Sequence, residues 1–374
     1  MKKLTTPILL VGSPAELSDL RYITGFAAVD PVVALCTATA THLVVPSMEL
    51  GRARRQARRG VRVLTPRDLP IRETQRCRVR FWALGLLRSL GLRRVLVPPA
   101  FPVGVARALE RAGVRVAVAD TLLFPSRAVK SRRELAALKN AQGAAAAAMR
   151  RALKLIAASR ADRAGFLRCG GRRLKAEDVR RVIDGMLAEH GAVARETIVA
   201  CGRDSADPHE QGAGPLRAGE PIVIDIFPQS RATGYWGDIT RTVVKGKPSA
   251  KLARMYAAVK AAQESALAQL RGGVNGTTLY RNVVRVFDAR GFHTVVGKGR
   301  AEGFTHSLGH GVGLDIHEVP SLGPVRARLR AGNVVTVEPG LYYRDTGGVR
   351  IEDTVLVTAR GFRYLAKCPK TLRI

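Results

Sequence analysis

Acidic side chains are scarce in this chain, which has 30 aspartates and glutamates against 62 lysines and arginines in 374 residues. The net charge of +32 invites a nucleic-acid interpretation, because a basic surface attracts phosphate whatever its fold. The excess is spread out: residues 1–125 hold 20 basic and 8 acidic side chains (20 − 8 = +12), which leaves 32 − 12 = +20 for residues 126–374. The densest run has no aromatic residues interleaved for base stacking, so we interpret it as the solvent-facing side of a helix and do not expect nucleic acid as a partner. That run comprises Arg52, Arg54, Arg55, Arg58 and Arg59.

Paired cysteines and long apolar runs are also missing. The five cysteines are odd in number and scattered, without a C-x-x-C pair, which argues against a structural zinc site and favours a reducing compartment. No apolar run is long enough to span a membrane. The apolar stretch near the N-terminus is short and is interrupted by Pro7, so it predicts a first β-strand and not a signal peptide. We therefore expect a cytoplasmic protein with no membrane partner.

Residues 1–125 alternate short apolar runs with helical stretches. The runs lie at residues 7–11, 43–45, 61–64, 95–97 and 114–118. This rhythm predicts an α/β domain with a sheet covered by helices. Pro125 disfavours helix in the residue before it and marks a joint, so we place a domain boundary between residues 1–125 and 126–374.

The second domain begins with a helix signal. Ser131 is followed three residues later by Glu134, the spacing of a capping box, and an alanine-rich stretch with an apolar face follows. Further helices are predicted at about 176–189, 250–270 and 276–290. Strand-like segments between and after these helices predict an α+β domain.

Five side chains that can bind metal follow one another in this domain: Asp225, Asp238, His310, Glu338 and Glu352. Three of the carboxylates lie in strand-like apolar segments, which read IVID at 222–225, VVTVE at 334–338 and VRIEDTV at 349–355. Four carboxylates buried together without a cation would be strongly destabilising. One imidazole with four carboxylates suits Mn, Zn, Co or Fe, and the negative charge exceeds what one divalent ion neutralises. The set therefore predicts two metal ions that share bridging carboxylates.

Five ordered segments carry a resemblance to a known family. They read GYWGDITRT at 234–242, HSLGHGVG at 306–313, HEVP at 317–320, EPG at 338–340 and RIED at 350–353. Together they resemble the pita-bread metallopeptidases, which include methionine aminopeptidase, Xaa-Pro aminopeptidase and prolidase. Residues 19–26, DLRYITGF, resemble the start of the extra domain of the proline-specific and creatinase-like members. The resemblance implies a creatinase/prolidase-like N-terminal domain followed by a pita-bread catalytic domain.

The resemblance also implies a role for each ligand. Asp225 would chelate one metal ion, and Asp238 and Glu352 would bridge both. His310 and Glu338 would complete the second ion, and Glu338 would also act as the general base toward a metal-activated water. Mn is the favoured ion, with Co, Zn and Fe left open.

Other residues match family positions around this set. His317 would polarise the scissile carbonyl, whereas His209 and His306 would line the substrate pocket. Arg350 and Thr240 are expected beside the substrate or behind the metal ligands. The remaining histidines, His42, His190 and His293, are interpreted as structural.

The spacing of the two aspartates departs from the family pattern. Asp225 and Asp238 are 238 − 225 = 13 residues apart, slightly wider than is typical, so the segment between them is predicted to be a lengthened hairpin turn. If the insertion is even-numbered, both aspartates still face the same side of the sheet.

The predicted function is hydrolysis of Xaa-Pro bonds in peptides by a two-metal exopeptidase, with a homodimer implied by the resemblance. An aminopeptidase acting on peptide N-termini and a dipeptidase both remain open. The alternative is a non-catalytic pita-bread binding protein with a basic, nucleic-acid-associated surface. The presence of all five candidate ligands favours the enzyme, because non-enzymatic relatives usually lose them.

Overall fold

The computed structural model describes residues 6–297 and 299–374, and the chain divides into two compact units, Met1–Arg127 and Ala128–Ile374. Each unit is described by itself. In the described residues, no helix is both long and apolar enough to cross a membrane.

The first unit is built on a six-stranded mixed sheet with the strand order β4-β3-β2-β1-β5-β6. The strands are β1 (Ile8–Gly12), β2 (Val32–Cys36), β3 (Thr41–Val44), β4 (Val61–Leu64), β5 (Arg94–Val97) and β6 (Arg115–Val118). Strand β2 pairs antiparallel with both β1 and β3, whereas the outer pairs are parallel. The apolar runs predicted all five other strands, but β2 was missed. It is fully buried, so no polar alternation marks it as a strand.

In the part of this unit that the structure describes, four α-helices cover the sheet: α1 (Ser18–Thr24), α2 (Leu50–Gln56), α3 (Val79–Ser89) and α4 (Val103–Arg111). Side chains alternate along β1, so that Leu9 packs with α3 and α4 while Leu10 packs with α1 and α2.

The prediction that the arginine run forms the solvent-facing side of a helix is only partly right. Arg54 and Arg55 are exposed on α2, but the helix ends at Gln56, so Arg58 and Arg59 lie beyond it.

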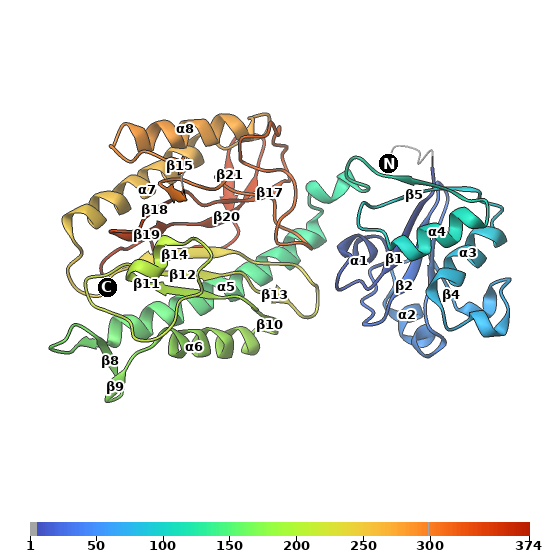
Figure 1. The fold of residues 1–374 in the computed structure, drawn as a ribbon, viewed down its shortest axis with the longest axis horizontal. Helices are drawn as coiled ribbons and strands as arrows, with labels where there is room; N and C mark the ends of the chain where they lie inside the picture. Colours follow the sequence, from blue (N-terminus) through green and yellow to red (C-terminus); the bar gives the residue numbers. More distant parts are fainter. Residues whose placement is uncertain (1–5, 298) are drawn as a thin grey trace. The chain divides into compact units, whose positions relative to one another are not determined.

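The second unit contains the four long helices that the sequence predicts. They are α5 (Arg132–Ala158), α6 (Ala176–Glu189), α7 (Ala250–Gln269) and α8 (Gly276–Asp288). Helix α5 begins as predicted, because Ser131 Oγ accepts a hydrogen bond from the Glu134 N–H in a capping box. Figure 1 shows the central strands of this unit lying between the pair α5 and α6 and the pair α7 and α8.

Three sheets form the layer between these helix pairs. The first contains β11 (Ile198–Cys201), β12 (Ile222–Ile226) and β14 (Ile239–Val243); the second β17 (Val334–Val337), β20 (Asp353–Val357) and β21 (Phe362–Tyr364); the third β18 (Gly340–Tyr343) and β19 (Gly347–Arg350). One apolar core joins α5 and α6 to β12 and β14, and another joins α7 and α8 to β17, β18, β19 and β20. The smaller strands are β7 (Arg160–Ala161), β8 (Leu167–Cys169), β9 (Arg172–Arg173), β10 (Ala192–Val193), β13 (Gln229–Ser230), β15 (Val295–Gly297) and β16 (Arg300–Glu302).

The segment between the two aspartates is more than the lengthened turn that the sequence predicts. It contains β13, which pairs antiparallel with β10, a strand from a distant part of the chain. Strand β12 pairs with β14 so that Asp225 lies opposite Thr240. Asp238 stands two residues before Thr240, and the alternation of strand side chains therefore places Asp225 and Asp238 on the same face.

Candidate metal centre

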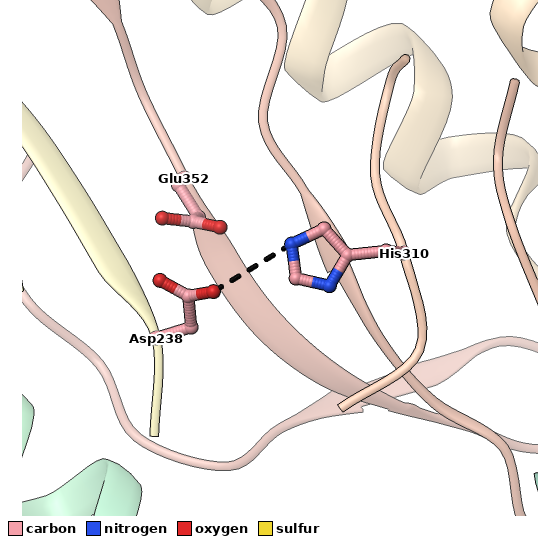
Figure 2. A group of neighbouring side chains, drawn as sticks. All are labelled: Asp238, His310 and Glu352. Carbon is pink, nitrogen blue, oxygen red and sulfur yellow. Dashed lines mark ion pairs between the residues drawn. The ribbon is translucent and has the colours of Figure 1, made fainter. Parts of the chain in front are cut away.

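The five candidate ligands stand on or beside strand ends of the second unit. Asp225 lies in β12, Asp238 immediately precedes β14 and Glu338 immediately follows β17, while Glu352 immediately precedes β20 and His310 lies in the loop before β17. Ligand atoms of Asp238, His310 and Glu352 all lie within 4.8 Å of one another. Figure 2 shows the two carboxylates side by side, with the imidazole edge directed toward Asp238.

His310 joins two of the carboxylates. Its Nε2 lies 3.2 Å from Glu338 Oε1 and 3.6 Å from Asp238 Oδ2. Burial alone would lower the pKa of His310, but the hydrogen bond and charge of Glu338 raise it to about 9. Burial would likewise raise the pKa of Glu338, and the same contact lowers it to about 2. Thr336 fixes both residues, because its hydroxyl donates to Glu338 Oε1 (3.0 Å) and accepts from the His310 main-chain N–H (3.0 Å).

The two carboxylate oxygens of Asp225 differ in their hydrogen bonding. Its Oδ2 accepts a hydrogen bond from Arg350 Nη2 at 2.7 Å. Its Oδ1 is buried and has no hydrogen-bond partner among the described residues. A buried carboxylate oxygen without a partner is costly, and in a group of carboxylates it indicates a place for a cation.

The charges of the cluster also call for a cation. Burial, and next the charge of Asp225, raise the pKa of Asp238 well above its usual range. Burial and the charges of Asp238 and Glu338 do the same for the pKa of Glu352. Oxygen donors from carboxylates with one imidazole suit Mn, Fe, Co or Zn. The residues therefore fit a site for divalent metal.

The three other predicted histidines lie around this cluster with different degrees of burial. The rings of His317 and His310 pack edge to face, with centroids 4.3 Å apart. Burial, and then the charge of His310, lower the pKa of His317, which keeps this imidazole neutral. His209 lies on an exposed loop, near enough to His306 and His317 to interact electrostatically with both.

His306 is held at both ring nitrogens. Its Nδ1 donates to the Ser307 carbonyl at 2.7 Å, so its Nε2 in the neutral ring accepts from the Tyr342 hydroxyl at 2.9 Å. Burial lowers the pKa of His306, which favours this neutral form. The arrangement suits a rigid pocket wall and leaves neither nitrogen free for proton transfer.

Arg350 and Thr240 are buried beneath the carboxylates. The Thr240 hydroxyl donates to Glu352 Oε2 at 2.8 Å and accepts from Arg350 Nε at 3.3 Å. Arg350 Nη1 donates to the carbonyl of Pro208 at 3.3 Å, next to His209. Arg350 therefore orients Asp225 directly, whereas Thr240 orients Glu352.

The sequence interpretation missed two supporting contacts. Arg350 Nη1 donates to the Tyr342 hydroxyl at 2.7 Å, which connects Arg350 to His306 through one phenol. Lys130 Nζ contacts Glu318 Oε2 at 2.6 Å, and both side chains are buried. Glu318 directly follows His317 in the sequence. In the sequence, the first contact is indicated only by the position of Tyr342, four residues after Glu338. Nothing in the sequence near Lys130 or Glu318 indicates the second contact.

Removing metal is expected to make the protein increasingly pH-sensitive. The folded-state pKa values of Asp238, Glu352 and His310 are raised, so their contribution to stability is complete below their unfolded pKa values and is lost as pH rises through the folded ones. Bound metal requires the deprotonated ligands and reverses this trend. The difference in Tm between Mn²⁺-loaded and EDTA-treated protein should widen from pH 6 to pH 9. Parallel Tm curves would contradict a metal at these residues.

Comparisons with known proteins identify the family of this chain. Residues 136–359 match the model of metallopeptidase family M24, and residues 1–129 match the creatinase/prolidase N-terminal domain. The chain is 29% identical to the Xaa-Pro dipeptidase of Pyrococcus horikoshii, over 96% of this chain and 93% of that protein. It is 32% identical to the Xaa-Pro dipeptidase of Pyrococcus furiosus, over 68% and 67%. The structure of the Xaa-Pro dipeptidase from Bacillus anthracis superposes with a TM-score of 0.83 at 26% identity, covering 99% of this chain and 95% of that one. The chain belongs to metallopeptidase family M24 and has the two-domain architecture of its prolidase-like members.

Proposed function

We propose that this chain hydrolyses Xaa-Pro bonds with two divalent metal ions, Mn²⁺ being the favoured pair. The observation that carries the proposal is the convergence of Asp238, His310 and Glu352 within 4.8 Å, beside the orphaned oxygen of Asp225. The names of the relatives that cover nearly the whole chain support Xaa-Pro substrates. The catalytic domain is assigned to residues 126–374 and the N-terminal domain to residues 1–125.

The ligand roles proposed here are those that the family resemblance implies, and the closeness of Asp238, His310 and Glu352 supports them. Asp225 would hold one ion, Asp238 and Glu352 would lie between the two, and His310 with Glu338 would hold the other. The ions supply positive charge that lowers the pKa of a bound water and stabilises developing negative charge.

The surrounding side chains are assigned to proton transfer and to orienting the substrate. Glu338 is assigned to accept the proton of the attacking water at its carboxylate. His317, kept neutral by burial and by His310, is assigned to donate a hydrogen bond to the scissile carbonyl. His306 and His209 are assigned to the substrate pocket, with His306 held in place by Tyr342.

The proposal also includes the length of the substrate peptide, the oligomeric state and the cellular location. A dipeptide substrate is favoured, because the Pyrococcus horikoshii protein and the Bacillus anthracis structure, which both match along almost the whole chain, are named Xaa-Pro dipeptidases. The family resemblance supports a homodimer, and five free cysteines support a cytoplasmic location.

Hydrolysis of Ala-Pro beside Ala-Pro-Ala tests the proposal. Metal-stripped protein is refilled with Mn²⁺, Co²⁺ or Zn²⁺, and free alanine is measured for both peptides. We expect metal-dependent cleavage, with Ala-Pro the better substrate. Preferred cleavage of Ala-Pro-Ala would indicate an aminopeptidase. If the protein neither binds metal nor cleaves either peptide, the proposal is overturned and a basic binding protein is favoured.

A further inference from the structure

Two buried glutamines lie on opposite sides of the candidate metal centre. Gln142 is on α5 and is 1% exposed, whereas Gln263 is on α7 and is 0% exposed. The two helices belong to the pairs that enclose the strand layer from either side (Figure 1). A buried amide side chain must find hydrogen-bond partners, and both glutamines bond to main-chain groups at, or directly before, the candidate metal ligands.

Gln142 makes two hydrogen bonds to the peptide groups of Asp238. Its Oε1 accepts from the Asp238 N–H at 2.7 Å, and its Nε2 donates to the Asp238 carbonyl at 2.8 Å. Asp238 lies just outside the β12–β14 ladder, whose last pair is Ile226 with Ile239, so its peptide groups have no partner strand there. The glutamine amide takes the place of a neighbouring strand.

The main chain approaches α5 closely at this point. A Cβ on Gly237 would lie 2.6 Å from the carbonyl oxygen of Ala141 and 2.9 Å from the nitrogen of Gln142. Only glycine fits this contact, and it brings Asp238 within reach of the glutamine amide. The Thr354 hydroxyl adds a third hydrogen bond, to the Asp238 carbonyl at 2.8 Å.

Gln263 hydrogen-bonds to the main chain directly before two of the three other acidic ligands, Glu338 and Glu352. Its Nε2 donates to the carbonyls of Val337 (2.9 Å) and Ile351 (3.1 Å), which directly precede Glu338 and Glu352. The same nitrogen lies 3.2 Å from Asp353 Oδ2. Its Oε1 accepts from Lys370 Nζ at 2.7 Å, which orients the amide so that its N–H groups face the strand ends.

We propose that Gln142 and Gln263 are positioning residues that set the spacing of the metal ligands through their main chain. Gln142 holds Asp238 in one half of the unit, and Gln263 holds Glu338 and Glu352 in the other. Ligand distances at a metal tolerate only small errors, so the hydrogen bonds that hold a ligand affect affinity even without touching the metal. This inference rests on the proposed metal-dependent function and adds two residues with no metal-binding chemistry of their own.

Mn²⁺ titration into metal-free protein by calorimetry tests the proposal. Methionine has a volume similar to glutamine but makes none of these hydrogen bonds, so Gln142→Met and Gln263→Met are the informative variants. Each is expected to weaken Mn²⁺ binding about 10–100-fold, as is typical for groups that orient metal ligands. Gln142→Asn and Gln263→Asn keep an amide but are too short to reach, and they should weaken binding in the same direction if the methionine variants do not fold.

Two matched variants separate positioning from general destabilisation. Met149→Ala on α5 and Met255→Ala on α7 remove other fully buried side chains of the same helices. They should lower the Tm of the metal-free protein and leave Mn²⁺ affinity unchanged. Glutamine variants that bind Mn²⁺ as tightly as the unmodified protein would overturn the positioning role alone. An unmodified protein that binds no Mn²⁺ would overturn the metal-dependent function and the positioning role with it.

Discussion

Replacing Asp238 by asparagine is expected to abolish metal binding and turnover while raising the Tm of the metal-free protein. Asparagine preserves the size of the side chain and the main-chain contacts with Gln142. It removes the negative charge that the proposed bridge requires, so neither ion should bind and activity should fall to that of metal-stripped protein. The two effects have opposite signs, which a general folding defect cannot produce.

The gain in stability follows from the pKa of Asp238. Burial and the charge of Asp225 raise that pKa well above its usual range, so the folded state loses stability from Asp238 as pH rises. The Tm of the metal-free variant should increase by about 2–4 °C for each kcal/mol by which the free energy of unfolding rises.

Calorimetry with Mn²⁺ measures the affinity of the Asp238→Asn variant, and thermal unfolding in EDTA at pH 8 measures its stability. Glu264→Gln, at an exposed site on α7, is the control and should change neither. Retained Mn²⁺ binding by Asp238→Asn would refute its bridging role.

Replacing Arg241 by methionine should produce the largest loss of stability in the second unit. Arg241 is 1% exposed, and its guanidinium contacts Asp353 Oδ1 at 2.7 Å. It also donates to the carbonyls of Pro369 and Cys368, each at 2.9 Å, and to those of Thr240 and Glu352. Removing one partner of a buried ion pair costs about 3–5 kcal/mol, because the other groups stay buried without their donor.

Urea unfolding of the metal-free protein can follow this unit separately. The chain has two tryptophans, Trp82 in the first unit and Trp236 in the second, so a Trp82→Phe background makes fluorescence report on the second unit. Arg281→Met, at an exposed position on α8, is the control and should change the free energy of unfolding by no more than about 0.5 kcal/mol. An Arg241→Met midpoint equal to that of the control would show that Lys370, 2.6 Å from Asp353, sustains the network alone.

Local elements were predictable because their causes are local. The start of α5 depends on Ser131 and Glu134, three residues apart, and its capping box forms as predicted. Strands β2 and β13 were missed for a different reason. The burial of β2 on both faces removes its sequence alternation, and β13 exists only because β10 is folded beside it.

The sequence by itself determined the chemistry of the candidate site. The types and order of Asp225, Asp238, His310, Glu338 and Glu352 indicate a cation, because buried carboxylates need a positive charge wherever they lie in a fold. Family membership followed from the same short segments. No knowledge of the packing was needed for either inference.

Only the tertiary structure decided how those side chains are held. Gln142 and Asp238 are 96 residues apart, and Arg241 and Asp353 are 112 apart, yet each pair is joined by hydrogen bonds. A glutamine or arginine can make such contacts in many places, so its residue type does not predict its partner. Burial selects the partner, because a peptide group excluded from water must pair with whichever donor or acceptor the packing of distant helices and strands brings to it.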